Sequence, residues 1–221
     1  MTSPACAGDL KDIPMPKIPL IALSLVVVLA GIGITVLSSR PPPKTSPAPV
    51  LPVPPPDVAE RPFQLTSHTG KPFTEQDLQG KVALLYFGYT FCPDVCPTEL
   101  GYLAKVMRAL GPDADLVIPV FITVDPARDT LPKLAEYVPL FDKRLIGLTG
   151  TQEQIDALAK AYGVFHQRTN VVTKEPGYYL IDHSSSIFLL DPQGHLVDTL
   201  DSDSAIPTAV GRVMRLLPAK K

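Results

Sequence analysis

Cysteine is scarce in this sequence, which contains only three among its 221 residues. Cys6 lies far from the other two, so only Cys92 and Cys96 can form a local pair. Small scaffolds that depend on several disulfides need more cysteines than this, so that class of protein is excluded.

An excess of charge of one sign is missing as well. The formal net charge is −2 at pH 7, and arginine and lysine form no run along the chain. Because proteins that bind nucleic acid present clustered basic residues to the phosphate backbone, we expect no nucleic-acid partner.

Charged residues are also absent from residues 18–37, which form one long apolar run. A helix of about 20 apolar residues spans a bilayer, so we predict a transmembrane anchor here and a short cytoplasmic N-terminus at residues 1–17. The run is followed by no convincing small-residue cleavage site and by no nearby cysteine. These absences favour a retained anchor over a cleaved signal peptide or a lipoprotein anchor.

The charges that flank the anchor say little about its orientation, because Lys11 and Lys17 precede it while Arg40 and Lys44 follow it. We place the C-terminal part outside the cytoplasm, since a cysteine pair is more useful in an oxidising compartment. No arginine precedes the anchor, unlike in a mitochondrial presequence. The expected location is therefore a bacterial inner membrane, crossed once, with the C-terminal domain in the periplasm.

Residues 38–57 are rich in proline, which favours a semi-rigid polyproline II linker between the anchor and a domain at residues 58–221. The turn signals at residues 67–70 predict a hairpin over residues 63–74. Apolar runs predict further strands at residues 82–87, 116–124, 145–148, 178–181, 187–190 and 196–200. Apolar residues at helical spacing predict helices at residues 98–110, 131–138, 151–162 and 205–217.

The cysteine pair lies between the predicted strand at residues 82–87 and the helix that follows it, with Pro97 suited to the first turn of that helix. A thiolate at such a junction meets the positive end of the helix, which lowers its pKa and favours disulfide attack or metal binding. Residues four apart in a helix have Cβ atoms about 5–6 Å apart, whereas a relaxed disulfide needs about 3.5–4.5 Å. The pair can therefore bind a metal or form a disulfide, and both alternatives stay open.

The order of elements is typical of an α/β fold, because strands first alternate with helices and a terminal hairpin then precedes a helix. Together with the cysteine motif after the first central strand, this order predicts a thioredoxin-like sandwich.

A histidine is available as a third ligand. His183 lies in a polar break before the strand at residues 187–190, a segment that passes beside the cysteine pair in a thioredoxin-like fold. Two thiolates and one imidazole suit copper(I), whereas structural zinc usually takes four protein ligands, and the sequence suggests no fourth. The remaining histidines are expected to be surface or packing residues: His68, His166 and His195.

Two aspartates follow the second central strand. Asp125 and Asp129 should lie on the same rim of the sheet as the cysteine loop, because parallel strands end on one side. One interpretation is that they cap a helix and form a salt bridge with Arg128. The other is that they tune the site or dock a partner.

These motifs together resemble those of the Sco/SenC family, at residues 86–97, 124–130 and 182–185. The resemblance extends from about residue 63 to residue 217 and includes the anchor. It implies a thioredoxin-like copper-binding protein that helps to assemble the dinuclear copper centre of cytochrome c oxidase. Cys92, Cys96 and His183 would hold copper, and Asp125 and Asp129 match the family's aspartate pair. The implied partners are subunit II of the oxidase, and in addition another periplasmic copper chaperone or a thioredoxin-like reductant.

Three activities fit such a cysteine pair. A metallochaperone would pass copper to the oxidase by ligand exchange, whereas a thiol-disulfide reductase would keep the oxidase cysteines reduced and would not need His183. A peroxidase ranks lowest. Peroxiredoxins place a threonine three residues before the reactive cysteine, where Cys92 and Cys96 have Tyr89 and Pro93.

Overall fold

The computed structural model describes residues 62–169 and 178–218 of the chain. The predicted N-terminus, anchor and linker, at residues 1–17, 18–37 and 38–57, lie outside these ranges. Within the described part, every helix is too short or too polar to cross a bilayer.

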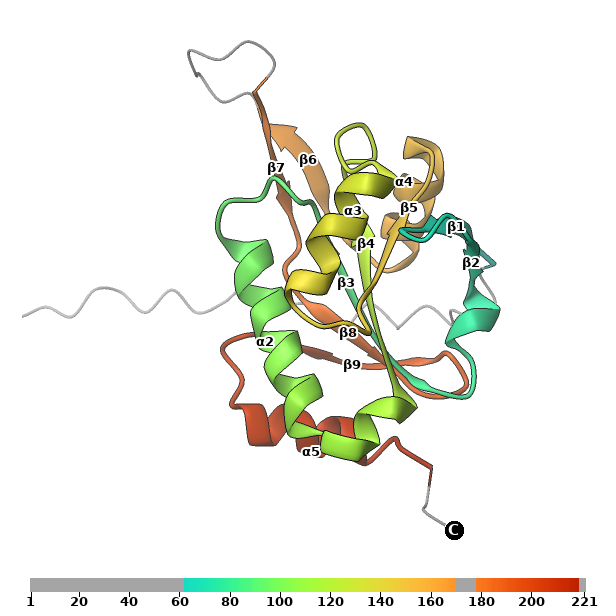
Figure 1. Ribbon diagram of the computed structural model, residues 1–221, viewed down its shortest axis with the longest axis vertical. Helices are drawn as coiled ribbons and strands as arrows, with labels where there is room; N and C mark the ends of the chain where they lie inside the picture. Colours follow the sequence, from blue (N-terminus) through green and yellow to red (C-terminus); the bar gives the residue numbers. More distant parts are fainter. Residues whose placement is uncertain (1–61, 170–177, 219–221) are drawn as a thin grey trace, which may run out of the picture. The chain divides into compact units, whose positions relative to one another are not determined.

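A seven-stranded mixed sheet forms the centre of the domain, with strand order β2-β1-β5-β4-β3-β8-β9 (Figure 1). A separate two-stranded sheet pairs β6 with β7. The strands are β1 (Gln64–Ser67), β2 (Pro72–Thr74), β3 (Val82–Gly88), β4 (Val117–Thr123), β5 (Ile146–Thr149), β6 (His166–Thr169), β7 (Leu180–His183), β8 (Ile187–Leu190) and β9 (Leu196–Leu200).

The three inner strands β3, β4 and β5 are parallel, and β8 lies antiparallel to β3 on its other side. Every residue of β3 is buried, as expected for a strand in the middle of a sheet whose two faces are both covered. This explains why its sequence, VALLYFG, is apolar throughout instead of alternating with polar residues. The parallel pairing brings the carboxyl ends of β3 and β4 to the same rim of the sheet.

Helices connect the strands and cover the sheet. The α-helices are α2 (Val95–Ala109), α3 (Leu131–Tyr137), α4 (Gln152–Ala161) and α5 (Ile206–Met214). Short 3-10 helices lie at η2 (Glu75–Leu78), η3 (Gly111–Leu116) and η4 (Val138–Leu140). The buried residues of α2 include Leu100 and Met107, and α2 lies beside α5 (Figure 1). A capping box starts α4, because the side chains of Thr151 and Gln154 each accept a hydrogen bond from the other residue's backbone N–H.

The α/β sandwich and the hairpin of β1 and β2 were predictable and are confirmed, but several elements differ from the prediction. Helix α2 begins at Val95 rather than at residue 98, because a proline in the first turn removes an N–H that has no helical partner anyway. Strand β7 covers Leu180–His183 instead of residues 178–181, so His183 ends a strand rather than lying in the polar break. Strand β6 was not predicted, since its sequence HQRT has no apolar alternation.

Candidate metal centre

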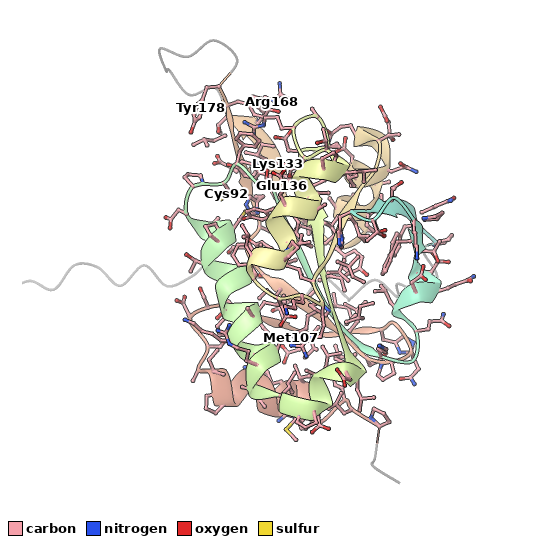
Figure 2. The ribbon with its side chains drawn as sticks, viewed as in Figure 1. Cys92, Met107, Lys133, Glu136, Arg168 and Tyr178 are labelled. Carbon is pink, nitrogen blue, oxygen red and sulfur yellow. The ribbon has the colours of Figure 1, made fainter. Side chains whose placement is uncertain are left out.

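The structure brings together Cys92, Cys96 and His183 at the rim where β3 ends. One donor atom from each residue lies within 4.8 Å of the other two. Cys96 Sγ and His183 Nε2 are 3.2 Å apart, and both cysteines are free and buried. Figure 2 shows Cys92 at the end of α2 that lies towards the β6-β7 hairpin, with Met107 near the other end of the helix.

The start of α2 holds the sulfur of Cys92. The first N–H groups of a helix have no partner within the helix, and the side chain of the preceding residue, Asp94, does not cap them. Instead, the backbone N–H of Cys96 points at Cys92 Sγ at 3.4 Å. The positive end of the helix and this N–H both favour a negative sulfur.

The two thiols share one proton. The hydrogen bond from the Cys96 thiol is the main cause that lowers the pKa of Cys92 to about 3, against the opposing effect of burial. Burial raises the pKa of Cys96 far above that of an ordinary thiol, and the negative charge on Cys92 adds to the rise. The reduced pair therefore carries one thiolate, on Cys92, and one thiol, on Cys96, at neutral pH.

The imidazole of His183 is oriented for metal binding. Its Nδ1 lies 2.8 Å from the carbonyl oxygen of Ser184, and a carbonyl can only accept a hydrogen bond. In the neutral tautomer that fits this contact, Nδ1 carries the proton and the lone pair of Nε2 is directed at the sulfur of Cys96. The rings of Tyr86 and Tyr89 stand edge-on to the imidazole, with centroids 6.2 Å and 5.7 Å away, and restrict its movement.

Gly88 leaves the space that the sulfur of Cys96 occupies. A Cβ atom at this position would lie 2.8 Å from Cys96 Sγ and 3.0 Å from a ring carbon of Tyr86. The phenol of Tyr86 is fully buried here, and burial together with the nearby sulfur of Cys96 raises its pKa.

Asp129 ties the cysteine loop to the end of β4. Its fully buried carboxylate accepts hydrogen bonds from the backbone N–H of Thr90 at 3.0 Å and from the hydroxyl of Thr90 at 2.6 Å. The hydroxyl of Thr123 donates a further bond of 2.6 Å. Because Thr90 precedes Cys92 by two residues, these bonds fix the loop from which the sulfur projects.

Asp125 belongs to a second group on the same rim. Its buried carboxylate pairs with the guanidinium of Arg128 and accepts a hydrogen bond of 2.7 Å from the hydroxyl of Tyr179. A salt bridge to Arg128 belonged to one of the two interpretations given for these aspartates. Neither aspartate caps a helix, because α3 begins after Thr130.

The other three histidines lie away from the two sulfurs. His68 accepts a hydrogen bond from the backbone N–H of Gly147, and His195 contacts Asp191 in the turn before β9. His166 lies opposite His183 in the β6-β7 ladder, and its Nε2 is 3.3 Å from Asp156. These contacts agree with the packing and surface roles expected from the sequence.

No role was predicted from the sequence for several residues that support the site. Tyr89 accepts a hydrogen bond from the backbone N–H of Ile181, and Thr90 and Thr123 hold Asp129. Tyr89 and Thr90 lie within the cysteine motif, so their position indicated a role at the site. Thr123 ends an apolar strand, and nothing in the local sequence indicated its role.

Comparison with known proteins identifies a family that this chain matches. The chain matches the SCO1/SenC family over residues 53–218. The mitochondrial protein SCO2 of Saccharomyces cerevisiae is 45% identical over 140 residues, which make up 63% of this chain and 46% of that protein. SenC of Rhodobacter capsulatus is 43% identical over 145 residues, which make up 65% of this chain and 63% of that protein. The chain thus spans less than two thirds of the length of either relative.

Solved structures show the same fold. The structure of Bradyrhizobium japonicum ScoI with copper bound has a TM-score of 0.66 and 42% identity, covering 71% of this chain and 98% of that one. Yeast Sco1 with copper bound has a TM-score of 0.63 and 38% identity, covering 70% and 85%. The domain therefore has a thioredoxin-like α/β fold. Its motifs, its fold and a family match over residues 53–218 agree, and the chain belongs to the SCO1/SenC family.

Proposed function

We propose that this protein is a copper carrier that binds copper through Cys92, Cys96 and His183. The observation that carries the proposal is the convergence of two sulfurs and the Nε2 of an imidazole at one rim of the sheet. Solved relatives at 42% and 38% identity have copper bound, which supports this choice of metal.

The donor set favours copper(I). Thiolate sulfur is a soft ligand, and two of them with one imidazole suit a soft monovalent ion. Among the described residues, the group of possible ligands contains only these three side chains, whereas a structural zinc site usually has four. A three-coordinate ion leaves a position for an incoming ligand, which allows transfer by ligand exchange.

We further propose that the recipient is subunit II of cytochrome c oxidase, whose dinuclear copper centre would take the metal. The resemblance of the motifs to the Sco/SenC family supports this partner. The predicted anchor at residues 18–37 would hold the domain at the periplasmic face of a bacterial inner membrane, where the oxidase is also embedded. Asp125 and Asp129 would support the copper-binding loops.

A second candidate function is the reduction of a disulfide in the recipient. The low pKa of Cys92, about 3, favours it, because the thiolate is the form that attacks a disulfide. Cys96 would then break the mixed disulfide, leaving a Cys92–Cys96 disulfide in this protein and two thiols in the recipient. His183 is not needed for this exchange.

Anaerobic titration with copper(I) against a chromophoric copper(I) chelator separates the two functions. The reduced protein should bind one equivalent, and His183→Ala should weaken binding by at least about tenfold while leaving both thiols titratable. Unchanged affinity in His183→Ala would refute the three-ligand site.

The role in the cell can be tested by deleting the gene and measuring oxidase activity. Restoration of activity by added copper supports copper supply. If copper fails and a small thiol restores activity, reduction is the main function.

A further inference from the structure

Arg128 contacts both of the chain segments that carry the candidate ligands. We call residues 89–96 the cysteine segment and residues 179–183 the histidine segment. The guanidinium carbon of Arg128 lies 4.8 Å from the ring centroid of Phe91, the residue next to Cys92. It lies 3.5 Å from the ring centroid of Tyr179, where the histidine segment begins. One side chain of the β4-α3 loop therefore contacts both segments.

Hydrogen bonds hold the guanidinium in this position. Its Nε donates to the carboxylate of Asp125, and its Nη1 donates to the backbone carbonyl of Tyr179 at 3.0 Å. The hydroxyl of Tyr179 donates to the other oxygen of Asp125 at 2.7 Å. The ion pair of Asp125 and Arg128 thus contacts Tyr179 at its ring face, its hydroxyl and its backbone carbonyl.

The other contacts between the two segments involve Tyr89 and the candidate ligands: the ring of Tyr89 and the sulfur of Cys96 both contact His183. The backbone N–H of Ile181 donates to the hydroxyl of Tyr89 at 3.1 Å, and the ring of Tyr89 lies 5.6 Å from the guanidinium of Arg128. Strand β7 pairs with β6 and not with the seven-stranded sheet. No ladder of the main sheet therefore fixes the histidine segment, and side-chain contacts hold it against the cysteine segment.

We propose that Arg128 is a positioning residue that joins the cysteine and histidine segments and so controls how firmly His183 joins the two sulfurs. The proposal rests on the copper site described above and deepens it. A planar guanidinium can stack on two aromatic rings and donate in its own plane at the same time, which a lysine ammonium cannot do. Arg128 needs no contact with the metal, because it acts through the two segments.

The test is a double-mutant cycle on copper(I) affinity. Arg128→Lys is the main variant, since it keeps a positive charge beside the buried Asp125 and so protects the fold. It removes stacking on two rings, so affinity should fall about tenfold in the parent. In the His183→Ala background the same change should alter affinity less than about twofold, because there is no imidazole left to position.

Arg168 provides a matched control. Its guanidinium carbon lies 3.7 Å from the centroid of the same Tyr179 ring, but it belongs to β6 of the same hairpin (Figure 2). Arg168→Lys removes stacking on Tyr179 without removing a link to the cysteine segment. It should leave copper affinity within about twofold of the parent.

A measurement without metal separates this proposal from the copper proposal. In the metal-free protein, hydrogen exchange at the backbone amide of Ile181 should speed up about tenfold in Arg128→Lys and remain unchanged in Arg168→Lys. Phe91→Leu, which removes the ring on the cysteine side, should reproduce the effect if Arg128→Lys does not fold.

Three results would overturn the role of Arg128: equal affinity losses with and without His183, an Arg168→Lys loss as large as that of Arg128→Lys, or unchanged exchange at Ile181. If the parent protein binds no copper but exchange at Ile181 follows the prediction, the copper proposal fails and the link between the segments stands.

Discussion

Gly88 ends β3 directly beside the sulfur of Cys96, and its lack of a side chain is what lets the sulfur lie there. We expect Gly88→Ala to displace the sulfur, because the new methyl group would meet Cys96, Tyr86 and Phe121 in a packed core. Overpacking of this kind costs about 1–3 kcal/mol. Copper(I) affinity and the free energy of unfolding should both fall, as measured by chelator competition and by urea denaturation.

Gly101 is the control for this change. It lies within α2, and a Cβ atom there would meet nothing within 4 Å outside its own helix. Gly101→Ala should keep copper affinity and raise stability by up to about 1 kcal/mol, since alanine favours the helix. Equal effects of the two substitutions would show that the space beside Cys96 does not matter.

The shared proton of the two thiols predicts an unusual pH profile. Because the pKa of Cys92 is lowered to about 3, its rate of alkylation by iodoacetamide should be nearly constant between about pH 5 and about pH 8 in the metal-free protein. An ordinary thiol with a pKa of about 8.5 would react about tenfold more slowly for each pH unit lost in this range. Mass spectrometry after partial alkylation would identify the residue, and a tenfold slope at Cys92 would contradict the prediction.

The same lowered pKa has a consequence for stability. Folding favours the thiolate of Cys92, so its contribution to stability is fully present above the unfolded thiol pKa of about 8.5. The contribution decreases as the pH falls towards the folded pKa of about 3.

At the scale of elements, the loop between β4 and α3 holds the cysteine segment through Asp129. Asp129→Asn should lower the free energy of unfolding by about 1–3 kcal/mol, because the amide is uncharged and can accept hydrogen bonds at only one of the two positions that now accept from Thr90 and Thr123. Thermal or urea unfolding measures the loss, and copper(I) affinity should decrease with it.

Asp203 is a suitable comparison, since its side chain is exposed. Asp203→Asn should change stability by less than about 0.5 kcal/mol. If Asp129→Asn is equally neutral, the hydrogen bonds from Thr90 do not fix the loop.

The local sequence predicted those elements that have a clear pattern of apolar residues of their own. Apolar runs located β3, β4 and β8, because inner strands are buried on both faces. Strand β6 is polar and partly exposed, and it is stabilised by pairing with β7. This pairing could not be predicted from the sequence of β6 alone. The three candidate ligands were predictable from residue type and fold order. The contact of Arg128 with Tyr179 was not, because 51 positions separate the two residues and no sequence motif relates them.

At the scale of the whole molecule, metal binding should stabilise the fold. A ligand that binds only the native state at 1,000 times its Kd adds about 4 kcal/mol to the free energy of unfolding. Calorimetry under anaerobic conditions should therefore show a Tm that rises with copper(I) and returns to its metal-free value when a chelator is added.

The double variant Cys92→Ser, Cys96→Ser should show no such rise, and His183→Ala should show a smaller one than the parent. A Tm that is unchanged by copper(I) in the parent protein would contradict binding to the folded site.

The contact between Cys96 and His183 joins residues 87 positions apart, and β4, α3, β5 and α4 lie between them. Closing so long a loop is entropically costly, so the three donors meet only after the intervening strands have paired. A newly made chain that has emerged only as far as α4 would offer the two sulfurs without the imidazole of His183. Binding of the copper ion by all three ligands is thus a late event, and it indicates that the domain has finished folding.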